Sequence, residues 1–236
     1  MNTHKDKGEL KTIVGIRPTG RLHIGHYFSV IKPALEEKAD VLIATYHVPK
    51  PDKETYPIPF EMKKQLEKFG VKTKFQIINE DLYFSLLSDS KMGELERMTQ
   101  YKSSKVKTPH LLMYPILMAH DLVGYDKVIV GDDQKQHVEY ANVLFKRLGF
   151  PKIKGDYRGG RIMSLTDPTK KMSKSEPEGC LFLGDDYEEK LKKAITTPAG
   201  IKNLTYIAKQ FGLKWNPKMN KESKQLLAEV LDNKFI

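Results

Sequence analysis

The sequence predicts an α/β fold: a doubly wound, parallel, Rossmann-like sheet with helices on both faces, followed by a short C-terminal helical extension. In the first half of the chain, short apolar runs alternate with helix-like segments, which is the βαβαβ pattern of such sheets. These runs are apolar without alternation, as expected for parallel strands buried on both faces. A chain of 236 residues can bury a full core. We expect one Rossmann-like domain over residues 1–184 and a helical segment over residues 185–236.

The first predicted unit is a strand, a loop and a helix. Ile13–Ile16 has strand character, and Arg17–Gly20 contains the Pro and Gly of a turn. A helix-like segment begins near His23. Pro33 lacks an N–H and crowds the carbonyl of Ser29, so the helix should kink or restart there.

Similar signals place the elements that follow. We expect a strand, a loop, a helix and a strand in turn, at Val41–Tyr46, Pro49–Pro59, Phe60–Phe69 and Phe75–Ile78. The next segment, Leu82–Tyr101, has a helical pattern, and Gly93–Lys102 within it reads as an amphipathic helix with paired charges.

The rest of the chain repeats this plan and then becomes helical. Leu111–Tyr125 is predicted as a helix with Pro115 in its first turn, where a missing N–H does no harm. A strand, a capping turn and a helix are expected at Lys127–Val130, Gly131–Asp133 and from Gln134 to Leu148. Further on, Lys190–Ala194 and Ile201–Phe211 look helical, and Trp215-Asn216-Pro217 breaks the pattern.

Composition narrows the class of protein. Lys and Arg number 40 against 30 Asp and Glu, a formal net charge of +10, which suits an anionic partner or simply solvated helix faces. The single cysteine, Cys180, allows no internal disulfide and suits a reducing compartment. No apolar run approaches 18 residues, and the first eleven residues are polar and charged. We expect a cytoplasmic protein with no membrane contact.

His23 and His26 form the first candidate site. They lie one helical turn apart, and Gly25 between them leaves room for a ring or a phosphate to approach the backbone. An incidental surface pair or half of a metal site would look the same, although the chain has no spaced Cys or His cluster. Neither a G-x-x-x-x-G-K-[ST] loop nor a G-x-G-x-x-G turn is present. Other groups must therefore hold any phosphates.

A cationic loop could supply those groups. Gly160–Lys170 leads into Lys171-Met172-Ser173-Lys174-Ser175, a flexible basic segment suited to closing over a triphosphate. A solvated basic loop is the alternative.

Asp121 is the third candidate. Tyr114, Met118 and Asp121 lie at i, i+4 and i+7 on one helix face. Burying an unpaired carboxylate costs several kcal/mol, and an acceptor beside aromatic and thioether groups suits the single N–H of an indole ring. Tyr and Met at this spacing would otherwise be core residues.

Two aspartates follow the fourth predicted strand. Asp132 and Asp133 at a helix start are most often caps. The loop also lies at the carboxyl end of a strand, so it could instead receive an ammonium group or ribose hydroxyls.

Together these motifs resemble a known family. Pro18-Thr19-Gly20 with His23-Ile24-Gly25-His26, and the loop Lys171–Ser175, look like the two ATP-binding signatures of class I aminoacyl-tRNA synthetases. The segments Gly93–Lys102, Tyr114-x-x-x-Met118-x-x-Asp121 and Gly131–His137 are similar to the bacterial tryptophanyl type. Tyrosine enzymes usually carry a glutamine where this chain has Met118.

The resemblance implies an AMP-forming ligase that activates L-tryptophan with ATP to tryptophanyl-adenylate and transfers it to tRNA(Trp). The implied catalytic residues are His23, His26, Lys171, Lys174 and Lys102. ATP would contact Arg17, Thr19, Gly25, His26, Asp133, Met163, Lys171, Ser173 and Lys174, and tryptophan would contact His47, Tyr114, Met118, Asp121 and Gln134. Mg²⁺ would bind through the ATP phosphates and to no protein site. Phenylalanine should be rejected because it would leave Asp121 unpaired.

The chain also departs from the family pattern. Arg17 stands where bacterial members often have glutamine, and Asp132 replaces a glutamate. The region after the lysine loop is short, so most of the anticodon-binding helices look absent and the acceptor arm of tRNA would be the main contact. A homodimer is implied. An adenylate-forming paralogue with another acceptor, and a non-catalytic tryptophan or ATP sensor, stay as alternatives.

Overall fold

The computed structural model describes residues 10–48, 57–158 and 162–236. The chain forms two compact units, the first of residues up to Thr19 and Ser29–Gly159, and the second of Gly20–Phe28 and Gly160–Ile236. The boundary expected at residue 184 lies inside the second unit. The polar start, most of the predicted loop 49–59 and residues 160–161 of the loop before Lys171 lie outside the described residues.

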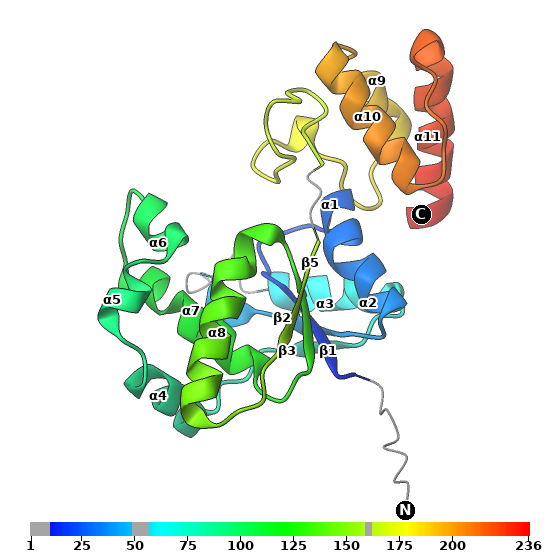
Figure 1. Cartoon of the computed structure of the whole chain (residues 1–236). Helices are drawn as coiled ribbons and strands as arrows, with labels where there is room; N and C mark the ends of the chain where they lie inside the picture. Colours follow the sequence, from blue (N-terminus) through cyan, green and yellow to red (C-terminus); the bar gives the residue numbers. More distant parts are fainter. Residues whose placement is uncertain (1–9, 49–56, 159–161) are drawn as a thin grey trace, which may run out of the picture. The chain divides into compact units, whose positions relative to one another are not determined.

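A five-stranded sheet of order β3-β2-β1-β4-β5 lies at the centre of the first unit (Figure 1). Every neighbouring pair is parallel; Ile13 of β1 aligns with Asp40 of β2 and with Val128 of β4. The strands are β1 Thr12–Ile16, β2 Asp40–Ile43, β3 Thr73–Phe75, β4 Lys127–Val130 and β5 Lys154–Tyr157. The chain winds from β1 outward to β3 and then returns to β4 on the other side. The predicted doubly wound fold is therefore confirmed.

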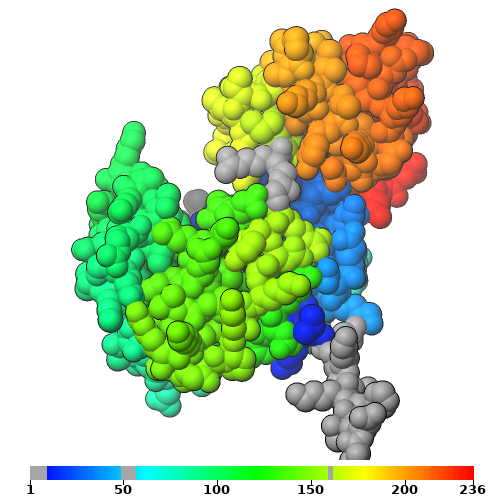
Figure 2. All heavy atoms as spheres, in the orientation of Figure 1, coloured from blue at the N-terminus to red at the C-terminus, as the bar shows by residue number. Residues whose placement is uncertain are grey.

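Helices cover both faces of this sheet. Ile13, Leu42 and Val128 belong to one apolar cluster with side chains of α4, α5, α7 and α8. Because strand side chains alternate, the buried Val14 and Ile129 face the opposite side. The helices of this unit are α2 Lys32–Glu36, α3 Ile58–Lys68, α4 Glu80–Ser88, α5 Met92–Leu95, α6 Thr99–Ser103, α7 Pro109–Leu122 and α8 Lys135–Leu148. Figure 2 shows the green residues of the α8 region on the near side of the first unit.

The second unit is mainly helical and has its own core. Ile24 packs in a cluster with Leu204 and Ile207 of α10 and with Leu227 and Leu231 of α11. Its helices are α1 Ile24–His26, α9 Tyr187–Lys192, α10 Pro198–Gln210 and α11 Asn220–Phe235. Helix α11 lies within the helical segment expected over residues 185–236, although it was not predicted as a separate helix, and α9 and α10 begin three residues earlier than predicted.

The opening helix is interrupted at the predicted place. After α1, residues Tyr27–Ile31 form a π-helical turn, and α2 restarts at Lys32 with Pro33 in its first turn. The expectation of a kink or restart at Pro33 is confirmed, since a widened turn is one way for a helix to accommodate such a break.

Several predicted elements have other limits. β2 ends at Ile43, and Thr45–His47 forms a 3₁₀ turn instead of continuing the strand to Tyr46. β3 ends at Phe75, where the prediction began it. The helix predicted over Leu82–Tyr101 is three helices, α4, α5 and α6, so the single helix over Gly93–Lys102 is wrong. Strand β5, which is polar and at the sheet edge, lacks the apolar run that marked the others.

Helix α7 begins earlier than predicted. Thr108 caps it by accepting a hydrogen bond from the Leu111 N–H at 3.1 Å, and Pro109 occupies the first turn. Pro115 consequently lies inside the helix, where the prediction had placed it at the start. Because Pro115 has no backbone N–H, α7 lacks the hydrogen bond that would otherwise reach the Leu111 carbonyl. The i, i+4, i+7 face of Tyr114, Met118 and Asp121 is unaffected.

No helix among the described residues is long and apolar enough to cross a membrane.

Replacing Thr108 with Ala should destabilise the protein by about 1 kcal/mol, because the cap of α7 loses its acceptor. The free energy of unfolding in urea measures this. Thr205→Ala, at an exposed position inside α10, is the matched control and should change stability by less than about 0.5 kcal/mol. Equal effects of the two changes would contradict the capping role.

Candidate functional site

A cavity of about 560 Å³ lies in the first unit, against the carboxyl ends of β1 and β4. These two strands are neighbours, but the chain leaves them in opposite directions across the sheet. In open α/β sheets, ligands bind at such a switch point. The cavity wall includes seven of the predicted site residues, together with His137; the seven are Arg17, His47, Tyr114, Met118, Asp121, Asp133 and Gln134.

One face of α7 forms an apolar wall with a single carboxylate. Tyr114, Met118 and Asp121 all line the cavity, as their spacing predicts. The His47 ring meets the Tyr114 ring edge-on with centroids 4.5 Å apart. Burial is the main reason why the pKa of Tyr114 is raised, so its hydroxyl stays protonated. The wall can pack a flat aromatic ligand and offer it one strong acceptor.

The buried carboxylate of Asp121 has partners from two other elements. His47 Nε2 lies 2.8 Å from Oδ2, and because an ionised carboxylate only accepts, the imidazole donates. Gln76 Nε2 lies 2.8 Å from both oxygens. Burial raises the pKa of Asp121, but interactions with His120, His47 and Gln76 outweigh it and lower the pKa overall. Asp121 is therefore ionised at neutral pH.

The ring of His120 lies beside this carboxylate and is oriented by the main chain. Its Nε2 accepts the Asn79 N–H at 3.0 Å, so the ring proton lies on Nδ1. That atom is buried 3.5 Å from Asp121 Oδ1 and has no closer hydrogen-bond partner among the described residues.

These contacts overturn one expectation. Phenylalanine was expected to be rejected because it would leave Asp121 unpaired, but His47 and Gln76 bond to Asp121 within the protein. Any discrimination against phenylalanine must come from the acceptor positions of Asp121 that His47 and Gln76 do not occupy.

The turn after β4 brings a second polar group to the cavity. Asp132–Gln134 forms a 3₁₀ turn, and α8 begins at Lys135 without a side-chain cap from either aspartate. Gln134 Nε2 donates to Asp133 Oδ2 at 3.1 Å, and Gln134 Oε1 lies 3.0 Å from His137 Nδ1. Burial lowers the pKa of His137 to about 4. A neutral His137 with its proton on Nδ1 therefore fixes the amide of Gln134.

In the second unit, main-chain groups fix the rings of His23 and His26. His23 Nδ1 accepts the Gly25 N–H at 3.0 Å, and His26 Nδ1 accepts the His23 N–H at 3.1 Å. Each neutral ring must then carry its proton on Nε2. Burial, with Lys174 and Lys171, lowers the pKa of His23 to about 4, and burial is also the main reason why the pKa of His26 is well below its usual value. The pair presents two neutral N–H donors.

Gly25 has a structural role that the sequence did not indicate. A Cβ atom at this position would lie 2.7 Å from Cε1 and 2.8 Å from Nδ1 of His23. The missing side chain therefore leaves room for the His23 ring in its capping position, in addition to any room for a ligand.

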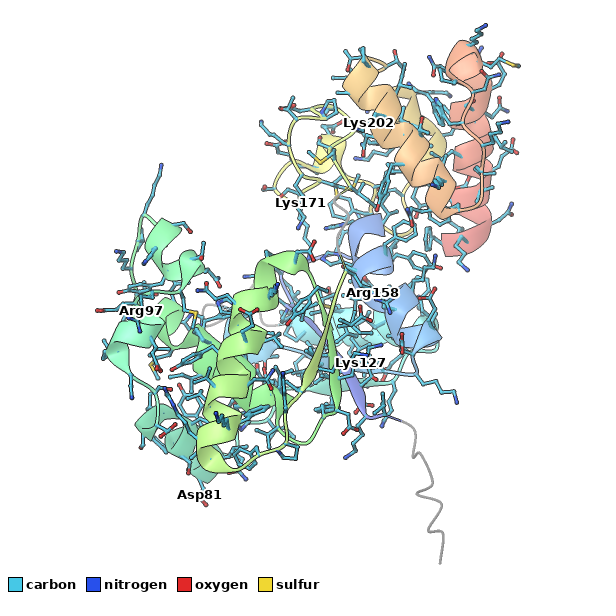
Figure 3. The ribbon with its side chains drawn as sticks, viewed as in Figure 1. Asp81, Arg97, Lys127, Arg158, Lys171 and Lys202 are labelled. Atoms are coloured by element: carbon cyan, nitrogen blue, oxygen red, sulfur yellow. The ribbon has the colours of Figure 1, made fainter. Side chains whose placement is uncertain are left out.

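The lysine loop is anchored at its start and carries exposed cations. Met163 pairs with Lys171 in an antiparallel bridge, and Asn203 of α10 bonds to both the N–H and the carbonyl of Met163, at 3.0 and 2.8 Å. Met172 is buried, whereas Lys171 is exposed (Figure 3). Lys174 Nζ lies 3.2 Å from the Gly20 carbonyl, so the loop and the His23 segment meet within this unit.

Four other residues were predicted to bind ATP or to take part in catalysis: Arg17, Thr19, Ser173 and Lys102. Arg17 lines the cavity, Thr19 is exposed just beyond it in sequence, and Ser173 bonds to Ser175 at 2.9 Å. Lys102 is exposed on α6, whose residues Thr99 and Ser103 line the cavity while Lys102 does not. Among the described residues, no group of three or more His, Cys, Asp or Glu side chains could hold a metal ion.

Sequence reasoning missed four polar residues of these sites: Gln76, His120, His137 and Asn203. Each is buried. Gln76 stands next to apolar residues at the end of a strand, and a buried polar side chain in that position needs a hydrogen-bond partner. Its neighbours in the sequence could therefore have indicated that Gln76 is a buried, hydrogen-bonded residue. The partners themselves are set by long-range contacts.

Comparison with known proteins agrees with this geometry. The family model of class I tRNA synthetases (W and Y) matches residues 63–234. The tryptophan–tRNA ligase of Oceanobacillus iheyensis is 35% identical over 230 aligned residues, which cover 81% of this chain and 69% of the relative.

Solved structures share the fold. Tryptophanyl-tRNA synthetase from Mycoplasma pneumoniae has a TM-score of 0.78 at 26% identity, covering 96% of this chain and 85% of that one. The Campylobacter jejuni enzyme complexed with ADP and tryptophan has a TM-score of 0.76 at 24% identity, covering 96% and 86%. By its match to the family model over most of its length, the chain belongs to the class I tRNA synthetases of the tryptophan and tyrosine family.

Proposed function

We propose that the chain is a tryptophan–tRNA ligase that activates L-tryptophan with Mg-ATP and transfers it to tRNA(Trp). The observation that carries this function is the cavity at the switch point, where the ionised Asp121 ends an apolar wall of Tyr114 and Met118. An indole presents a flat apolar ring and one N–H donor, which suits this wall. The relatives named tryptophan–tRNA ligase support the same substrate.

The amino acid would occupy this cavity. Asp121 would accept the indole N–H, while Met118 and Tyr114 pack on the ring and His47 closes the site beside Asp121. Gln134 and Asp133 stand on the turn after β4 and would contact the amino acid or the ribose.

ATP would be held mainly by the second unit. The Nε2–H groups of His23 and His26 would donate to the phosphates, and Lys171 and Lys174 would stabilise the departing pyrophosphate. Gly25 and Met163 would border the adenine, and Ser173 would bind the phosphates beside the lysines. Arg17, Thr19 and Lys102 of the first unit are further candidates for the phosphates. Mg²⁺ would arrive on ATP as part of the substrate.

The first reaction is an in-line displacement. A carboxylate oxygen of tryptophan forms a bond to the α-phosphorus, and the bond from that phosphorus to the bridging oxygen breaks, releasing pyrophosphate. A hydroxyl of the terminal adenosine of tRNA then attacks the acyl carbon, and AMP leaves. No protein nucleophile is required, so the residues act by positioning and by stabilising charge.

Partners and setting follow from the same proposal. The tRNA would be bound chiefly through its acceptor arm, in keeping with the net charge of +10. We also propose a cytoplasmic homodimer, which sedimentation of the purified protein can test.

Acylation of total tRNA with labelled tryptophan, beside tryptophan-dependent exchange of labelled pyrophosphate into ATP, tests the function. Both reactions are expected. Lys174→Ala should lower the exchange rate about 100-fold because a cation that stabilises the transition state is lost, whereas Lys202→Ala, an exposed lysine on α10, should leave it unchanged. Exchange without acylation would favour the paralogue with another acceptor. Tryptophan binding without exchange would favour the sensor.

A pH dependence follows from the neutral histidines. The pKa of His23 is lowered to about 4, so between pH 6.5 and 4 the unfolded chain binds a proton that the folded chain does not. Stability should therefore fall as pH drops through this range, by up to about 1.4 kcal/mol per pH unit for this group. His23→Asn keeps a capping acceptor but cannot titrate, and should make the dependence shallower in urea unfolding at pH 7 and pH 5. An unchanged slope would show that His23 is not the group responsible.

A further inference from the structure

Gln76 follows β3 directly and is buried, with 5% of its surface exposed. Its backbone N–H continues the sheet ladder to the Ile43 carbonyl at 3.1 Å. It does not line the cavity, so its side chain is not placed to contact a ligand there directly.

Among the described residues, the hydrogen bonds of the Gln76 amide go to the turn that carries His47 and to Asp121. Oε1 accepts the Tyr46 N–H at 2.8 Å, and Nε2 donates to both oxygens of Asp121 at 2.8 Å. A flipped amide would set oxygen against carboxylate and N–H against N–H. Gln76 therefore has one orientation, which joins the turn carrying His47 to the carboxylate on α7.

The acceptor capacity of Asp121 can be counted. A carboxylate accepts about four hydrogen bonds, two at each oxygen. Oδ2 accepts from His47 and Gln76, and Oδ1 accepts from Gln76. Among the described residues, these hydrogen bonds leave one acceptor position of Asp121, on Oδ1, which His120 Nδ1 approaches only to 3.5 Å. An indole brings a single N–H, which matches this remaining capacity.

We propose that Gln76 is a positioning residue that selects tryptophan: it orients the Asp121 carboxylate and the His47 turn so that one acceptor position is presented to the indole N–H. This role rests on the proposed function and deepens it. It separates amino-acid recognition from phosphate chemistry, because among the described residues the Gln76 amide bonds only to Asp121 and to the turn that carries His47.

Two variants test the role. Gln76→Met keeps the length of the side chain but removes every polar contact of the amide. Gln76→Glu keeps the shape and sets a second carboxyl against Asp121, which raises the pKa of one of the two carboxyls. The other titratable groups facing Asp121 are His47 from the turn after β2 and His120 and Tyr114 from α7.

In pyrophosphate exchange, Gln76→Met should raise the KM for tryptophan about 10-fold or more, as expected for losing hydrogen bonds to a charged group. The KM for ATP should change less than about twofold, since removing a ground-state contact to one substrate leaves the other unaffected. The preference for tryptophan over phenylalanine should shrink in the same proportion. Gln65→Met on α3, away from the cavity, is the matched control and should behave as wild type.

The pH profile separates positioning from mere packing. In Gln76→Met, fewer donors counteract the effect of burial on Asp121, so the pKa of its carboxyl should be higher than in the wild type. The KM for tryptophan should therefore rise as pH falls from 7 to 5. In Gln76→Glu, a protonated glutamic acid can donate to Asp121 and still accept from Tyr46, so the KM should fall over the same range. A residue that only packs the core would lower thermal stability in both variants without these opposite trends.

The controls distinguish the two proposals. Labelled tryptophan in equilibrium dialysis measures binding without catalysis, and circular dichroism establishes that each variant is folded. A wild-type chain that binds no tryptophan would overturn both the function and the role of Gln76. A wild-type chain that binds, beside folded variants with unchanged affinity and pH profile, would overturn only the role of Gln76.

Discussion

The buried carboxylate of Asp121 is the constraint on which the cavity of the first unit depends. A charge taken out of water is stable only where donors from the protein meet it, and here they come from the turn after β2 and from the end of β3. Three segments distant in sequence must therefore arrive at one point. The parallel sheet makes this possible because the carboxyl ends of β2 and β3 lie side by side, next to the wall that α7 provides.

The same principle recurs wherever a functional group is held in this protein. The rings of His23 and His26 are fixed by main-chain N–H groups, and the amide of Gln134 is fixed by His137. In each case the atom turned toward the backbone or a neighbour is an acceptor or donor of known type, so the atom left for a ligand is determined too. The hydrogen bonds within the protein thus determine which donor or acceptor atom of each side chain is available to a ligand.

The arrangement also explains why neutral histidines and exposed lysines occur together. Burial beside Lys171 and Lys174 disfavours a third and fourth positive charge, so the imidazoles stay uncharged and act as N–H donors. The positive charge is left to lysines, of which Lys171 is solvent-exposed. A triphosphate would thus meet fixed neutral donors and longer, more adaptable cations.

The sequence by itself determined what depends on neighbouring residues. Apolar runs indicated β1, β2 and β4, and the fixed period of a helix placed Tyr114, Met118 and Asp121 on one face even though the start of α7 was misplaced. The motifs around His23 and Lys171 led to the family. Helix breaks within residues 82–101 were missed because packing, not periodicity, divides that segment.

Only the tertiary structure decided which groups meet. His47 and Asp121 are 74 residues apart, and Gln76 and Asp121 are 45 apart, so their contact depends on strand order and register, which local patterns do not encode. For this reason the sequence predicted an Asp121 that is unpaired until a ligand binds, whereas in the structure Asp121 is already hydrogen-bonded to other residues of the protein. The edge strand β5 was missed for the same reason, since its polar residues become a strand by pairing with β4.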